Sequence, residues 1–239
     1  MRPRAWLALA VSVLLLAACA GPGPAPDLPA AARPPVDAGA PANHTAAAYL
    51  AQGPAPWQPA DVDADALAAD FTVAADGTGT HRSVQAAVDA VPAAGYAPAA
   101  RRWVIRIRPG TYRGPLCVQD KAPLRLAGEP GHPGAVTLVD GRYHALPKAV
   151  GTPAQPCVPQ LEATRHGTSG SATAVIASPD VLLAHLTIAN DATPSGRPPV
   201  AEGAQAVALL TLADRVQLEG VRLVSHQDTF YAKRPTRQA

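Results

Sequence analysis

The sequence predicts an all-β protein, a parallel β-solenoid with one short helix at the start of its folded part. Strand-type apolar runs follow one another with only turns between them, and the hairpin dipeptide Asn-Gly is absent from the sequence. The apolar pattern recurs after a shift of 35 residues, as expected when successive coils stack alike. A β-sandwich is the alternative that this pattern disfavours.

The composition limits the classes of function. With 48% hydrophobic and 16% charged residues, the 239-residue chain can bury one sizeable core, so one main domain is expected. The net charge of +2 is small, and no basic stripe with interleaved aromatic residues occurs in the sequence. Nucleic acid is therefore not an expected partner.

The first 19 residues are expected to form an export signal of the lipoprotein type. Arg2 and Arg4 precede the apolar run Trp6–Leu16, which is too short to span a bilayer comfortably. The sequence Leu16-Ala-Ala-Cys19 resembles the lipobox of bacterial lipoproteins, in which the cysteine is acylated. This resemblance implies attachment to a membrane by the lipid alone, and Ala20, where inner-membrane lipoproteins carry Asp, implies the outer membrane. An ordinary cleavable signal peptide with an incidental cysteine is the alternative.

Residues 20–60 are expected to be a tether, and residues 61–239 the folded domain. The tether is rich in Pro, Ala and Gly, so it cannot bury enough apolar surface to offset its ordering entropy. Proline-rich chain favours an extended conformation, which would lift the domain off a membrane. Asn43-His-Thr45 matches a glycosylation sequon, but a bacterial export signal argues against its use.

The folded part is expected to open near Phe71 with a turn and a helix. Asp76-Gly-Thr-Gly-Thr80 is a turn cluster, and it lacks the lysine and the third glycine of nucleotide-binding loops. Ser83–Pro92 follows with apolar residues at helical spacing and a proline that stops the helix. The apolar positions are Val84, Ala87, Val88 and Val91.

Strand-type runs occupy the rest of the chain. They are Trp103–Ile107, Leu124–Leu126, Val136–Leu138, Ala172–Ile176, Val181–Ile188, Ala206–Leu212 and Val216–Val224. The 35-residue shift lays Val181, Leu183, Leu186 and Ile188 on Val216, Leu218, Val221 and Leu223. The Pro- and Gly-rich stretch from Gly128 to Glu162 has a length typical of functional or disordered loops.

Short blocks between Phe71 and Tyr231 occur in the order found in pectinesterases (pectin methylesterases). They are Asp76-Gly-Thr-Gly with Val84–Asp89, Ile107–Tyr112, Gly170–Thr173, Leu186–Asn190, Gln205–Leu209 and Gln227–Tyr231. The chain therefore resembles that family, which implies a right-handed single-stranded parallel β-helix and implies no cofactor.

The same resemblance implies a chemistry. Pectinesterases hydrolyse the C6 methyl esters of galacturonosyl units in pectin, with an aspartate nucleophile and a second aspartate as general acid/base. Asp228 resembles the acid/base residue, Gln227 the oxyanion donor, and Gln205 the glutamine that lines the same cleft. Amides suit this role because they donate to a developing negative charge without a charge of their own to desolvate. Two nearby carboxylates would also raise one pKa, which keeps one of them protonated.

Part of the family pattern is missing. The nucleophilic aspartate, in an Asp-Phe-Ile-Phe-Gly type motif, and the substrate-binding arginine and tryptophan have no counterpart in the sequence up to Ala239. The chain is therefore expected to be truncated at its C-terminal end and inactive as it stands. A non-catalytic surface lipoprotein that binds polysaccharide is the alternative, and a reading frame that continues into the missing motif would separate the two.

Other catalytic assignments are weaker. His226 stands beside Gln227 and Asp228, but a solvated loop histidine explains it more simply than a catalytic base. Ser169 and Ser171 are candidates for a serine hydrolase, yet their segment is not Gly-x-Ser-x-Gly and no strand-turn-helix follows it.

The cysteines fit an oxidising compartment. With Cys19 lipidated, Cys117 and Cys157 remain as an even pair, and the sequence leaves open whether they form a disulfide. The seven histidines are scattered singly, so no metal site is expected. The protein is expected to be a monomer whose partner is pectin or a related methyl-esterified polygalacturonate.

Overall fold

A computed structural model describes residues 45–51, 58–59, 68–95, 101–192 and 203–233. The chain divides into two units, residues 1–54 and 55–239. In the first unit, α2 (Ala46–Leu50) begins at Thr45, whose Oγ1 accepts a hydrogen bond from the Ala48 backbone N–H at 3.1 Å. One helical turn therefore lies within the stretch that its composition suggested to be extended. The expected signal peptide and Cys19 lie outside the described residues.

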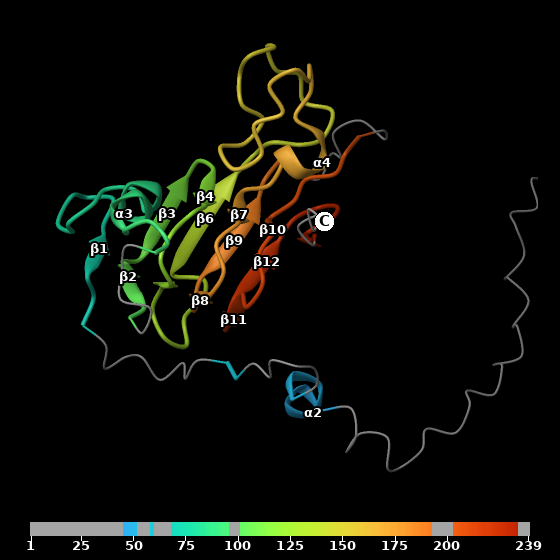
Figure 1. The fold of residues 1–239 in the computed structure, drawn as a ribbon. Coiled ribbons are helices and arrows are strands. Elements are labelled where there is room, and N and C mark those ends of the chain that lie inside the picture. The colour runs from blue at the N-terminus through green and yellow to red at the C-terminus, as the bar shows by residue number, and fades with distance from the viewer. Residues whose placement is uncertain (1–44, 52–57, 60–67, 96–100, 193–202, 234–239) are drawn as a thin grey trace, which may run out of the picture. The chain divides into compact units, whose positions relative to one another are not determined.

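The described residues of the second unit form a parallel β-helix between Phe71 and Ala232, as predicted (Figure 1). Sheet 1 contains β1 (Phe71–Val73), β2 (Trp103–Ile107), β5 (Leu124–Ala127), β8 (Val181–Ala184) and β11 (Gln217–Glu219). Sheet 2 contains β4 (Leu116–Val118), β7 (Ala174–Ile176), β10 (Leu209–Thr211) and β13 (Phe230–Ala232). Sheet 3 contains β3 (Gly110–Arg113), β6 (Val136–Asp140), β9 (Thr187–Asn190) and β12 (Arg222–Val224).

Every pairing between these named strands is parallel, and the predicted 35-residue repeat is confirmed. Leu183 pairs with Leu218, and Ile188 pairs with Leu223. The predicted run Val181–Ile188 is, however, two strands, because His185 turns the chain with a φ of 53°. Gly220 makes the same corner one coil later with a φ of 56°. A positive backbone φ is uncommon for a residue other than glycine. The histidine at position 185 therefore did not indicate a corner in the sequence.

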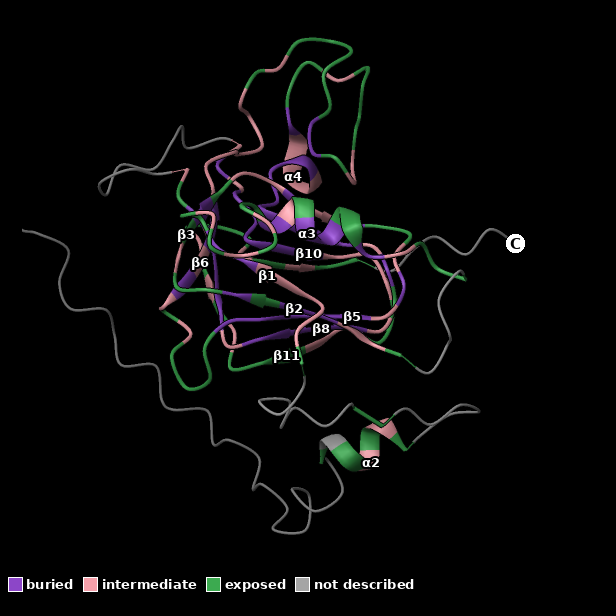
Figure 2. Ribbon diagram, turned by 90° about the vertical axis from the view of Figure 1, so that its left-hand side faces the viewer, coloured by how far each residue is buried: buried purple, intermediate pink, exposed green. Residues whose placement is uncertain are grey.

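The core consists of aliphatic side chains stacked from coil to coil. Ile105 pairs with Leu126, Leu126 pairs with Leu183, and all three are fully buried. Figure 2 shows β5 and β8 of sheet 1 coloured as buried and β11 largely as exposed. At β11 the same column continues to Leu218, which is 37% exposed. Each coil thus covers the side chains of the one before it, and Leu218 in the β11 coil is more exposed than the core residues of the earlier coils.

The predicted helix is α3 (Val84–Ala90), and it packs on β1, β2 and β4. It begins where Ser83 Oγ accepts a hydrogen bond from the Ala86 backbone N–H at 3.2 Å. Val84, Ala87 and Val88 turn inward and are buried, as their helical spacing predicts. Among the residues that the structure describes, no helix is long and apolar enough to cross a membrane.

A long loop, residues 141–166, leaves the coil between β6 and β7; we refer to it as the excursion. It stands out beyond the ends of the sheets and ends at α4 (Gly167–Gly170) (Figure 1). The loop is shorter than the predicted stretch from Gly128 to Glu162, because β6 lies inside that range. Backbone hydrogen bonds join its two arms, from Lys148 N to Thr164 O at 2.9 Å and from His166 N to Leu146 O at 3.1 Å.

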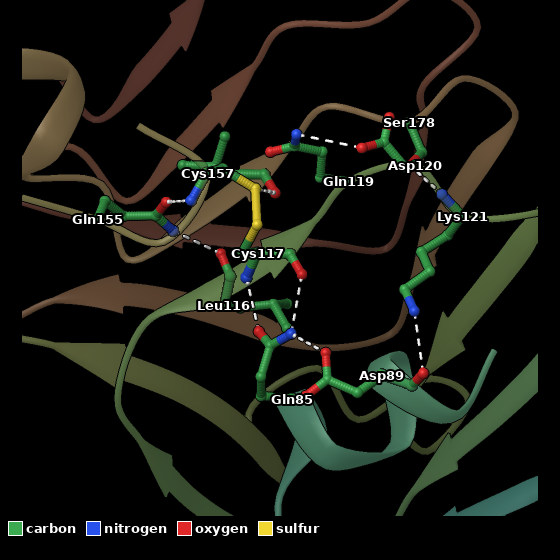
Figure 3. Close-up of a disulfide and its surroundings, with 11 residues drawn as sticks. Gln85, Asp89, Leu116, Cys117, Gln119, Asp120, Lys121, Gln155, Cys157 and Ser178 are labelled. Carbon is green, nitrogen blue, oxygen red and sulfur yellow. Dashed lines mark hydrogen bonds between the residues drawn. A yellow bond between two sulfur atoms is a disulfide. The ribbon is translucent and has the colours of Figure 1, made fainter. Parts of the chain in front are cut away.

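A disulfide between Cys117 and Cys157 ties the excursion to β4 (Figure 3). Gln155, fully buried, donates from Nε2 to the Leu116 carbonyl at 2.8 Å and accepts from the Cys157 backbone N–H. On the other side, Gln85 of α3 bonds both backbone groups of Cys117, with distances of 2.8 and 3.0 Å. The disulfide therefore joins the helix, the sheet and the excursion at one place.

Candidate active site

The structure brings the candidate residues of two successive coils together. Gln205 precedes β10, and Gln227 and Asp228 precede β13, at the same edge of sheet 2. The Ala206 backbone N–H donates to the Gln227 carbonyl at 3.0 Å. Positions 205 and 227 are thus neighbours on adjacent coils. Stacking of the coils brings together these two positions, which are 22 apart in the sequence.

Asp228 stands at an exposed corner. Its backbone has a φ of 57°, a left-handed conformation that aspartate tolerates better than most residues. Together with Thr168, Phe230 and Tyr231 it lines a hollow of about 440 Å³. Tyr231 fixes the strand behind it by packing on a small buried cluster that includes Val207 and Leu210. The carboxylate is exposed, and the pairing of β13 with β10 positions the strand that follows it.

Gln205 lies deeper than Gln227 and Asp228, which are both exposed. Its Oε1 atom is shielded from solvent and accepts no hydrogen bond from the described residues. A buried acceptor left in that state costs on the order of 1–3 kcal/mol. Gln205 also lines a second hollow of about 770 Å³ with residues of the excursion, which are Tyr143, His144, Ala145, Pro147 and Arg165, and with Gly203.

The excursion is fastened to this edge by backbone hydrogen bonds. His144 N donates to the Gln205 carbonyl at 2.8 Å, and Gly167 N donates to the His144 carbonyl at 3.0 Å. The ring Nδ1 of His144 lies 2.9 Å from Thr168 Oγ1. His144 lines the Gln205 hollow and Thr168 lines the Asp228 hollow, so one lining residue of each hollow contacts the other here. The sequence analysis did not identify His144, Thr168 or Arg165 as site residues. The only feature of the sequence that pointed to this region was the length of the loop.

The base of the excursion is held by charge and burial. Arg142 pairs with Asp140 and donates from Nη1 to the Ala154 carbonyl at 2.6 Å. His166 donates to the same carbonyl from Nδ1 at 2.7 Å. Burial lowers the pKa of His166, and the positive charge of Arg142 lowers it further. His166 is therefore neutral at neutral pH and acts as a structural donor.

The weaker candidates have structural explanations. Ser171 is fully buried; its Oγ accepts from Val207 N at 3.1 Å and donates to the Thr168 carbonyl at 2.7 Å, so it does not face a substrate. His226 is exposed and makes no hydrogen bond with the described residues, as a solvated loop histidine would. Within the described ranges, no group of three or more His, Cys, Asp or Glu side chains is placed to hold a metal ion.

This arrangement offers one accessible carboxylate that lines one hollow, one side-chain amide, Gln205, that lines another, and the exposed amide of Gln227 next to Asp228 in the chain. An amide placed here can donate to a developing oxyanion, and Asp228 can exchange a proton with a leaving group or a water. The hollow that Asp228 lines has no second carboxylate among its described residues. The geometry suits hydrolysis at a carbonyl carbon once a nucleophile is supplied.

Comparisons with known proteins agree with this chemistry. No protein-family model matches the chain. Pectinesterase B of Dickeya dadantii (strain 3937) is 35% identical over 270 residues, which cover 97% of this chain and 60% of that protein. A protein of Escherichia coli (strain K12), named putative acyl-CoA thioester hydrolase YbhC, is 31% identical over 207 residues, which cover 77% of this chain and 46% of that protein.

A solved structure shares the fold. The pectin methyl esterase of the rice weevil superposes with a TM-score of 0.61 at 25% identity, over 84% of this chain and 53% of that one. The chain thus spans about half to three fifths of the length of these relatives. Similarity along nearly the whole sequence and a shared β-helix show that this chain belongs to the pectinesterase family.

Proposed function

We propose that the protein hydrolyses the C6 methyl esters of galacturonosyl units in pectin or a related methyl-esterified polygalacturonate. The observation that carries this proposal is the placement of Gln205 on one coil and of Gln227 and Asp228 on the next, before neighbouring strands of sheet 2. A relative named as a pectinesterase, aligned over 97% of the chain, supports it. Because the chain covers 60% of the first of these relatives, the activity is proposed for a protein that includes further coils.

In the proposed mechanism, a second carboxylate from a further coil attacks the ester carbonyl. Gln227 donates to the oxyanion, with Gln205 beside it, and removal of one such donor costs about 10²–10³ in rate. Asp228 gives its proton to the departing methanol and then takes one from the water that hydrolyses the acyl intermediate. The products are methanol and a free uronate, and Asp228 returns to its starting state.

The test is methanol release from highly methylated pectin. These 239 residues are expected to be inactive, and a version extended through the next coils is expected to be active. In the extended protein, Asp228→Asn should abolish turnover, and Gln227→Ala should lower it by about 10²–10³. Asp214→Asn, at an exposed position on another corner of the coil, is the matched control and should leave turnover unchanged. Hydrolysis of acyl-CoA thioesters in place of pectin would refute the proposed substrate.

A non-catalytic surface protein that binds polysaccharide is the second candidate. The single carboxylate in the Asp228 hollow favours it, because the described residues provide no nucleophile beside that residue. Binding of pectin by both the shorter and the extended protein, with no methanol released by either, would establish this function instead.

We also propose that the protein is exported, carries a lipid on Cys19 and is a monomer at the outer membrane. The arginines, the apolar run and the Leu-Ala-Ala-Cys sequence at residues 2–19 support export and attachment to a membrane. Incorporation of labelled palmitate that is lost in Cys19→Ala, with release of that variant from the membrane fraction, is the expected result. Recovery of unlabelled, soluble wild-type protein would refute the anchor.

A further inference from the structure

A hollow of about 520 Å³ lies where β2 and β5 end, at the corner between sheet 1 and sheet 3; we call it the corner hollow. Its floor comes from two cross-strand pairs, Val104 with Arg125 and Arg106 with Ala127. These side chains alternate along the strands with residues of the core, so they point out of the coil. The corner hollow shares no described lining residue with the two hollows of the candidate active site, and it is therefore a separate feature.

The walls of the corner hollow are two short turns. Arg108–Pro109 follows β2, and Gly128–Pro130 follows β5. The backbone N–H at position 128 donates to the Ala184 carbonyl at 2.9 Å, and a Cβ there would lie 2.1 Å from the His185 carbonyl oxygen. A proline in each turn also restricts the backbone. The second turn is thus held closely against the next coil.

The described residues that line the corner hollow carry more positive than negative charge. Arg106, Arg108 and Arg125 line it together with a single acid, Glu129. Arg106 and Arg108 are exposed, whereas Arg125 is only 2% exposed and lies in the floor. A hydrogen bond from Arg108 Nη1 to Thr78 Oγ1, at 2.7 Å, positions one of the exposed guanidinium groups. Three guanidinium groups with one carboxylate favour an anionic ligand.

The rest of the lining suits an acidic sugar better than a bare ion. Val104, Pro109, Ala127 and Pro130 offer apolar surface between the charges, against which a pyranose ring can lie. Planar guanidinium groups donate paired hydrogen bonds to carboxylates. The volume of about 520 Å³ is many times the roughly 30 Å³ that a water-sized group occupies in a liquid. The corner hollow therefore has room for a sugar ring as well as for its carboxylate.

We propose that the corner hollow is a second polysaccharide-binding site, which holds a de-esterified segment of the polymer at a distance from the edge where hydrolysis takes place. Arg106 and Arg108 contact the uronate carboxylates, and Arg125 adds positive charge from the floor. Hydrolysis of methyl esters creates these carboxylates, so the polymer gains affinity for this site as the reaction proceeds. The protein then stays on a polymer that it has begun to modify. This inference rests on the proposed function for its substrate class.

Chemical modification of the full chain, mapped by mass spectrometry, tests the site without any turnover. Phenylglyoxal modifies exposed arginines, and the probes are unesterified hexagalacturonate, the fully methyl-esterified hexamer and inorganic phosphate. The unesterified hexamer should slow the modification of Arg106 and Arg108 about threefold or more, as expected for exposed charge-assisted contacts, and the esterified hexamer should not. Arg222, which is exposed on β12 of sheet 3, is the internal control and should react at one rate throughout. Equal rates at Arg106 with and without the unesterified hexamer, or equal protection by phosphate, would overturn the site.

Variants separate the corner hollow from the candidate active site. Arg106→Gln/Arg108→Gln should weaken calorimetric binding of the unesterified hexamer about tenfold, and the control Arg222→Gln should not. Because neither Arg106 nor Arg108 lines the hollows of the candidate active site, the extended form of the double variant should still release methanol. Unchanged binding in the double variant would refute the site and leave the esterase standing. Protection of both arginines in a protein whose extended form releases no methanol would keep the site and refute the esterase.

Discussion

Removal of the disulfide between Cys117 and Cys157 should have a large and calculable effect on stability. The bond closes a loop with a sequence separation of 40 residues. Chain entropy then predicts a loss of about 4 kcal/mol in the free energy of unfolding. With a urea dependence of roughly 2 kcal/mol per molar, the midpoint of unfolding should fall by about 2 M. The double variant Cys117→Ala/Cys157→Ala is the appropriate change.

The assay is urea unfolding followed by circular dichroism, with and without a reducing agent. The wild type should lose the same stability on reduction, whereas the double variant should not respond to reductant. Because Gln155 and Gln85 hold the chain on both sides of the bond, the variant should still fold. Limited proteolysis should then cut first within residues 141–166. A midpoint that falls by less than about 0.5 M would refute the entropic reasoning and place the excursion outside the cooperative unit.

Two further predictions concern single corners of the coil. Gly220→Ala should lower the free energy of unfolding by about 1 kcal/mol more than Gly131→Ala. Both glycines have a positive φ, but only at position 220 would the new Cβ lie 2.7 Å from another atom, His185 Nδ1. Thermal unfolding measures the difference, and equal losses would contradict it. The hydrogen bond from Arg215 lowers the pKa of Asp180 in the folded protein. The pair therefore stabilises the folded state at pH values above the ordinary aspartate pKa, and this stabilisation is lost as the pH falls through the lowered pKa of Asp180. Arg215→Gln should therefore reduce stability slightly at pH 7, by less than about 1 kcal/mol, and not at roughly pH 2; an equal loss at both would refute the assignment.

The stacked core could be predicted because it has a period. Leu183, Ile188, Leu218 and Leu223 repeat at a shift of 35 residues, and the structure pairs them in that register. The helix could be predicted for a similar reason, since Ser83 caps a segment of helical spacing. The corners could not be predicted in this way. The left-handed backbone conformation of His185 depends on its neighbours in space and not on the residue type.

The candidate site was predictable only in part. Gln205, Gln227 and Asp228 belong to blocks that resemble a known family, and stacking of the coils makes two of them neighbours. Their roles stay predictions. The excursion has no periodic pattern, and its position depends on contacts between distant residues, such as the bond from Gln155 to Leu116. Arg165 therefore gave no signal in the sequence, although the structure places it beside Gln205.

The register of the sheets has a consequence for how such a protein can change over evolutionary time. Trp103 pairs with a residue 21 positions later, Ala174 with one 35 later, and Cys117 with one 58 later, yet all three pairs sit in the same kind of parallel ladder. The ladder is therefore insensitive to how much chain a single turn contains. Segments can be gained, lost or exchanged at the corners while the frame that carries Asp228 keeps its geometry. New substrate preferences can arise in this architecture by replacing a corner, with little need to redesign the interior.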